Sequence, residues 1–229
     1  MSFLQQGATL SVVNGTCSPT ISGVTAGNAL ICEYGVNDAK TLAAPTDSAG
    51  QTWLIRAQYD ANGQSLAIAY LLNANAGTHT LTWATTSDAA TAAISEWNGI
   101  TSATGGTAAT GSQAAGTSLT SGSYTPAQAT EVVIAVLNEF GSNTNDGVKC
   151  TTVAFQAIGT TNDGGSEPCI ALEQNGATYN AFEANAQITS SATALTAAYS
   201  WTPSNSAIVL VAGFAYSAVT DVLYPQAVF

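Results

Sequence analysis

The sequence predicts an all-β protein, folded as an antiparallel β-sandwich of jelly-roll or Ig-like type in one large domain. Runs rich in Val, Ile, Thr and aromatic residues alternate with Gly-, Asn- and Asp-containing turns along the 229 residues. No stretch shows a convincing helical period, and Lys and Glu, which favour helices, are scarce. These two observations favour strands almost everywhere.

In the first half, turn signals separate several of the expected strands. The residues after Asp60-Ala-Asn-Gly63 read as the second strand of a hairpin. The next strand alternates cleanly, so His79, Leu81 and Trp83 share one face. The expected strands are residues 8–13, 28–34, 52–59, 64–72, 78–84 and 91–97.

The second half has the same style. Residues 131–137 form a continuous apolar run, as in a strand buried on both faces. The other expected strands are residues 152–158, 169–173, 179–188, 194–202 and 207–216. Residues 101–123 are almost all Thr, Ser, Gly and Ala, which predicts a linker or long crossover. The alternative is an exposed strand with small side chains.

Residues 1–219 are expected to form the domain, with two related halves at 1–100 and 124–219 as one interpretation. Asn28-Ala-Leu-Ile31 is echoed by Glu131-Val-Val-Ile134, and the run ending at Trp83 by the run ending at Trp201. Chance similarity in a biased composition is the rival explanation. Residues 220–229 form an apolar tail, which should pack on its own domain or on a neighbouring subunit.

Charge excludes several partners. The net charge is −11 and only three residues are basic, so no basic footprint exists for nucleic acid or an anionic membrane. The longest apolar run, residues 207–216, is about half of the roughly 20 residues that a membrane-spanning helix needs. The first residues do not resemble a secretion signal. We therefore expect a virion or extracellular location, reached after signal removal or by packaging into a virus particle.

The four cysteines have no C-x-x-C spacing, which makes a zinc site improbable. Buried free thiols are one expectation. If the cysteines are oxidised, the simpler pairing joins sequence neighbours, Cys17 with Cys32 and Cys150 with Cys169.

No catalytic constellation is evident. His79 is the only histidine, and no G-x-S-x-G elbow presents a serine, so a core or edge role for His79 is favoured. The sequence lacks a closely spaced pair of carboxylates on one strand face, as a glycosidase would need. Turn chemistry accounts for the Asp- and Asn-rich loops without a calcium ion. We expect no enzyme activity, no cofactor and no metal.

One segment carries a family resemblance. Asp47-Ser-Ala-Gly-Gln-Thr-Trp53 is followed by a strand ending at Tyr70, then Asn73-Ala-Asn-Ala-Gly77 and Glu96-Trp-Asn-Gly99. This order resembles β-sandwich domains of bacteriophage structural proteins and some bacterial surface proteins. The resemblance covers about a third of the chain and implies a fold, with no catalytic residues to transfer. Turn chemistry predicts that Asp47 and Ser48 bond back to the turn backbone. Trp53, Trp83 and Trp97 are expected to fill the sandwich core, and an exposed platform that stacks on sugar rings is the alternative.

The function expected from these observations is a structural protein of a phage-like particle: a capsid decoration, fibre or tail-associated protein. It should be a homo-oligomer, with a trimer as the first guess, or bind other virion or surface subunits. Its tail would supply the assembly contacts through Val222, Leu223, Tyr224, Val228 and Phe229. The alternative is a carbohydrate-binding or adhesive surface module that binds glycans.

Overall fold

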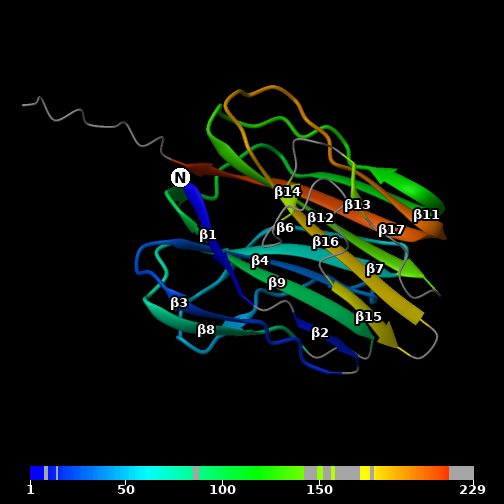
Figure 1. Ribbon diagram of the computed structural model, residues 1–229, viewed down its shortest axis with the longest axis horizontal. Coiled ribbons are helices and arrows are strands. Elements are labelled where there is room, and N and C mark those ends of the chain that lie inside the picture. Colours follow the sequence, from blue (N-terminus) through cyan, green and yellow to red (C-terminus); the bar gives the residue numbers. More distant parts are fainter. Residues whose placement is uncertain are drawn as a thin grey trace, which may run out of the picture.

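A computed structural model describes residues 1–7, 10–13, 15–84, 88–141, 149–151, 156–157, 171–175 and 178–216. Its regular elements in these ranges are strands, and every strand pairing is antiparallel. Two large sheets pack face to face (Figure 1). The predicted all-β sandwich is confirmed.

The first large sheet, called sheet I, is built from residues before 100. Its strands are β1 (Ser2–Gln6), β2 (Leu10–Val13), β4 (Ala29–Val36), β6 (Leu54–Ala61), β7 (Gln64–Leu71) and β9 (Ala89–Asn98). Their order across the sheet is β1-β9-β4-β7-β6, with β2 also paired to β9. A small sheet, β3-β8-β5, covers the outer face of sheet I; it comprises β3 (Thr20–Val24), β5 (Thr46–Asp47) and β8 (Gly77–Thr82).

The second large sheet, called sheet II, is built from residues after 99. Its strands are β10 (Ile100–Ser102), β11 (Ala109–Thr120), β12 (Glu131–Gly141), β13 (Lys149–Cys150), β14 (Gln156–Ala157), β15 (Ala171–Asn175), β16 (Thr178–Ile188) and β17 (Ala198–Tyr216). The central order is β10-β17-β12-β16-β14, with β11 and β13 on β17 and β15 on β16.

The protein has three apolar layers. One lies between sheets I and II, a second lies under the small sheet, and a third lies on the outer face of sheet II around Tyr124, Tyr199 and Trp201. All eight residues of β4 are buried because both faces of this strand are covered. Its Leu30 faces the small sheet and its Ile31 faces sheet II. The continuous apolar runs at β4 and β12 reflect this double burial.

The two sheets approach each other closely at Gly35. A Cβ atom there would lie 2.7 Å from Asn138 Oδ1 and 2.9 Å from the Phe182 ring. Beside this point a polar row joins the halves: Asn138 donates to Asn37 at 3.1 Å and to Gln64 at 2.7 Å. Gly35 is therefore required by close packing, not by a turn.

Sheets I and II repeat one strand order. Central strand β4 lies between β9 and β7, just as β12 lies between β17 and β16. The registers also match, since Ala29 pairs with Trp97 where Val132 pairs with Phe214. The sequence echo of residues 28–31 in 131–134 falls on these two equivalent strands.

Several expected boundaries change. Residues 109–120 form strand β11, so the alternative of an exposed strand holds for that part of 101–123. Residues 194–202 and 207–216, expected as two strands, meet in the single 19-residue β17, which keeps pairing through its irregular middle. Strands β1 and β3 were not expected, because these short sequences lack the sustained apolar alternation that marks a half-buried strand.

Candidate functional site

The turn that carries the family resemblance also carries a buried polar network. Strand β5 ends at Asp47, whose carbonyl accepts a hydrogen bond from the Gly50 amide at 3.0 Å. The Asp47 carboxylate accepts one from the Ala49 amide at 2.9 Å, and Gly50 has a φ of 69°. The Ser48 hydroxyl accepts one from the Thr80 amide at 3.0 Å. Asp47 thus bonds to the backbone of its own turn, as the sequence suggested, whereas the Ser48 side chain bonds to the backbone of β8 instead.

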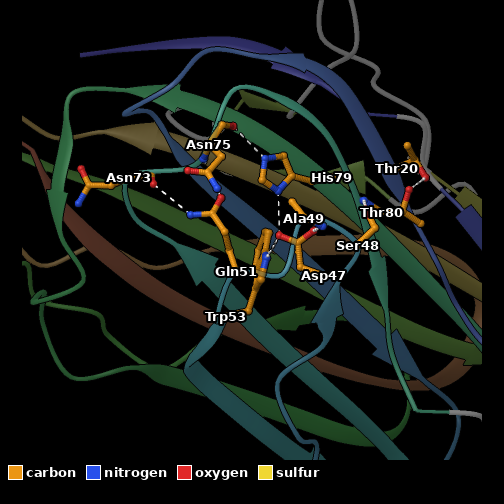
Figure 2. A network of polar contacts seen from close by, with 10 residues as sticks. All are labelled: Thr20, Asp47, Ser48, Ala49, Gln51, Trp53, Asn73, Asn75, His79 and Thr80. Atoms are coloured by element: carbon orange, nitrogen blue, oxygen red, sulfur yellow. Dashed lines mark hydrogen bonds and ion pairs between the residues drawn. The ribbon is translucent and has the colours of Figure 1, made fainter.

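Asp47 is also the hub of side-chain contacts shown in Figure 2. Its Oδ2 lies 2.8 Å from Nδ1 of His79, on β8, and accepts a hydrogen bond from Trp53 Nε1 at 3.1 Å. The other nitrogen of His79, Nε2, lies 3.0 Å from the Asn75 carbonyl oxygen. The side chains of His79 and Asp47 are both 0% exposed. The network joins the 47–53 turn to the 73–77 turn.

The geometry of His79 favours a structural role. Each ring nitrogen lies within hydrogen-bond distance of an oxygen of the protein, Nδ1 of Asp47 Oδ2 and Nε2 of the Asn75 carbonyl. A general base instead needs a nitrogen that can reach a substrate proton. Gln51 strengthens the same junction, donating to the Asn73 carbonyl at 3.3 Å and accepting from the Asn75 amide at 2.7 Å (Figure 2). That His79 has no catalytic role stays a prediction.

The tryptophans behave as core residues. Trp53, Trp83 and Trp97 are each exposed by 2% or less, and Trp201 by 3%. Trp83 stacks on Tyr34 with ring centroids 4.4 Å apart. The prediction that these rings fill the core is confirmed.

Two further buried carboxylates cap the loops that lead into the central strands. Glu96, on β9, accepts hydrogen bonds from the Thr25 amide at 2.8 Å and from the Asn28 side chain at 2.6 Å. Burial alone would raise the pKa of Glu96, but the bonds from Asn28, Thr25 and Gln5 outweigh it and lower that pKa. Glu131, on β12, plays the same part in the second half. It accepts from the Tyr124 hydroxyl at 2.5 Å and from the Ala127 amide at 2.7 Å.

Arg56, the only arginine, bridges the halves. Its Nε donates to the Gly213 carbonyl at 2.9 Å and its Nη2 to the Gly106 carbonyl at 2.8 Å. It therefore serves as an internal contact between β6 and the second half. Among the described residues, no group of three or more His, Cys, Asp or Glu side chains is arranged to hold a metal ion.

The surface offers a different kind of candidate site, at the edge of sheet I. Among the described residues, the exposed large apolar side chains are Phe3 (37%), Leu4 (46%), Leu54 (51%) and Ile188 (53%). Two of them lie next to each other on β1, which pairs with β9 and, within the described residues, with no other strand. The sequence does not reveal this site, because residues 2–6 carry no sustained strand pattern.

The other predicted site residues have mixed outcomes. Cys17 and Cys32 are both buried, and neither is joined in a disulfide. Their pairing on oxidation stays a prediction, and Cys169 and the Cys150 side chain lie outside the described residues. The five tail residues, Val222, Leu223, Tyr224, Val228 and Phe229, also lie outside them.

Comparisons with protein-family models, curated proteins and solved structures found no match for this chain. The described residues form no helix that is long and apolar enough to cross a membrane.

Proposed function

We propose that this chain is a non-enzymatic structural subunit of a phage-like particle, a capsid decoration, fibre or tail-associated protein that acts through assembly contacts. Its partners are other virion or surface subunits and copies of itself, and its place is the virion or the extracellular space. The observation that carries the proposal is the edge strand β1, which has no ionisable side chain and exposes Phe3 and Leu4.

An edge strand presents backbone amide and carbonyl groups that can pair with another chain. Proteins that avoid such pairing place Lys, another charged residue or Pro on the edge strand. The sequence of β1, Ser-Phe-Leu-Gln-Gln, has none of these. Phe3 packs edge-on against Trp97, with ring centroids 5.3 Å apart. One of the two exposed apolar side chains of β1 is therefore already held in position.

The charge distribution supports contacts of this kind. Two of the three basic side chains are engaged within the chain: Lys40 pairs with Asp38 at 3.0 Å, and Arg56 bridges the halves. Few cations therefore remain for ion pairs between subunits. Apolar and backbone hydrogen-bonded contacts suit such a surface better.

The alternative, a carbohydrate-binding or adhesive module, would use exposed aromatic rings to stack on sugars. All four tryptophans are buried, which weighs against that alternative. The particle protein remains the better-supported proposal.

The β1 contact is tested by Leu4→Lys. A charge on the edge should weaken self-association or particle binding by about tenfold or more, measured by sedimentation velocity and by copurification with particles. Ile188→Lys is the matched control, because Ile188 is equally exposed but lies on β16, which is paired on both sides. Equal loss in both variants would argue against β1 as the contact.

Deletion of residues 220–229 tests the tail separately. We expect weaker assembly with an unchanged far-ultraviolet circular dichroism spectrum. Loss of the β signal would mean that the tail belongs to the core. A wild-type chain that sediments as a stable monomer and never copurifies with a particle or surface would refute the assembly function itself.

A further inference from the structure

A second inference does not depend on the proposed function, and it concerns Glu33 at the centre of β4. Its neighbours across the strands are Ile68 on β7 and Ala93 on β9, and both belong to the apolar layer between sheets I and II. Glu33 is 0% exposed. Its carboxyl group therefore lies in the interface between the two halves.

This carboxyl group has no compensating contact. Neither Oε1 nor Oε2 has a hydrogen-bond partner among the described residues. Burial raises the pKa of Glu33 to about 8, and the polar backbone of Glu33 itself offsets that rise only in part. A neutral carboxylic acid is tolerated in an apolar layer far better than a carboxylate, whose charge would be unpaired.

The ionisable groups around this layer do not offset the charge. Cys32 is the next residue on β4 and faces the small sheet, away from the interface. At the margin of the layer lie Tyr59 and Tyr70 from sheet I and Tyr216 from sheet II. Among the described residues, the cation that joins the halves is Arg56, whose guanidinium group donates to the carbonyls of Gly213 and Gly106.

The second half shows that the fold does not require a carboxyl group here. By register, Val136 on β12 holds the place of Glu33: its neighbours across the strands are Ala184 and Leu210, which match Ile68 and Ala93. Val136 is also 0% exposed in the same layer. The same strand position is thus filled without cost by an apolar side chain.

We propose that Glu33 makes the contact between sheets I and II proton-dependent. The packed halves hold the neutral acid, and ionisation, which breaks the O–H bond and releases the proton to solvent, loosens the interface. The direction follows from linkage. Below pH 4.5, the ordinary value for Glu, the carboxyl group is protonated in folded and unfolded chains alike. Between that value and about 8 the unfolded chain ionises first, so stability falls as pH rises.

The test compares wild type with Glu33→Gln and Glu33→Val in urea unfolding at several pH values from 4.5 to 9. Relative to either variant, the wild-type ratio of folded to unfolded protein should fall by up to about tenfold per pH unit until about pH 8, then level off. Asp60→Asn, which changes an exposed carboxylate on β6, is the control and should run parallel to wild type.

Hydrogen exchange locates the effect. Above pH 8, corrected amide exchange in wild-type β4 and β12 should rise relative to both Glu33 variants, while β3 and β8 of the small sheet should change less. Wild-type and Glu33→Gln stability curves that run parallel across the whole pH range would overturn the proposal. Exchange that rises equally in all strands would also overturn it, because the interface would then not be the part that loosens.

Discussion

On the outer face of the first half, the buried residues His79 and Asp47 link two turns. The equivalent positions in the second half are occupied by Ala197 and Cys150. The equivalence follows from register. Asp47 pairs with Leu81 on β8 as Cys150 pairs with Tyr199 on β17, and His79 and Ala197 each lie two residues earlier. Trp83 and Trp201 then follow two residues later, and both are buried.

The loop caps differ in a related way. Glu96 caps the first half from β9, beside Asn28, the residue before β4, whereas Glu131 caps the second half from β12, beside Gly213 on β17. The capping carboxylate therefore comes from a different strand in each half, but it caps the equivalent loop. A Cβ atom on Gly213 would lie 2.1 Å from the Tyr124 hydroxyl oxygen and 2.3 Å from Glu131 Oε2. The glycine is therefore the necessary complement of the carboxylate opposite.

These differences show that the two halves share their strand pairing and apolar layers. The buried polar groups, by contrast, differ from one half to the other. Each buried polar group requires its own complement: a partner for each nitrogen of His79, or a glycine opposite Glu131. The halves should therefore respond differently to substitutions at equivalent places.

The largest effect is expected from His79→Ala, which places the second-half residue in the first half. It leaves a cavity in the core and removes the ring's hydrogen bond to the buried Asp47, and we expect a loss of about 3–5 kcal/mol in the free energy of unfolding. His79→Gln keeps a donor and should lose less. Denaturant unfolding measures both. A loss below about 1 kcal/mol for His79→Ala would show that the network does not stabilise the fold. A hydrolytic activity abolished by His79→Gln would show that His79 is catalytic.

Gly213→Ala should cost somewhat less, about 1–3 kcal/mol, because the added methyl group overlaps Tyr124 and Glu131. The same measurement applies. Adding Glu131→Gln to this variant should recover little, since the Tyr124 hydroxyl still blocks the methyl group. The idea of a required glycine fails if Gly213→Ala is as stable as wild type.

The smallest effect concerns the thiols. Burial raises the pKa of Cys17 to about 12, and burial, followed by the nearby Glu33, raises that of Cys32. At pH 8 both should resist alkylation in the folded protein and react on unfolding, as followed by mass spectrometry of labelled peptides. A non-reducing peptide map tests the pairings expected on oxidation. A link from Cys17 to Cys150 or Cys169 would contradict them.

The sequence by itself determined the class of structure and much of the core. Alternation in residues 78–83 places His79, Leu81 and Trp83 on one buried face, and all three are buried. Turn residues such as Gly50 and the Asn62-Gly63 pair take the positive φ values that their types favour. These features depend on local backbone preference and on a period of two, and both can be read along the chain.

The tertiary structure alone decided which buried positions face each other. Glu33 lies in a run that reads as an ordinary buried strand, and only the packing of sheet II over it leaves its carboxyl group without a partner. Strand β1 becomes a strand because β9 supplies its hydrogen bonds, although its own residues carry no strand pattern. Likewise, His79 gains its role from Asp47, 32 residues away. Contacts between distant segments are set by how sheets stack, and this information is not contained in local periodicity.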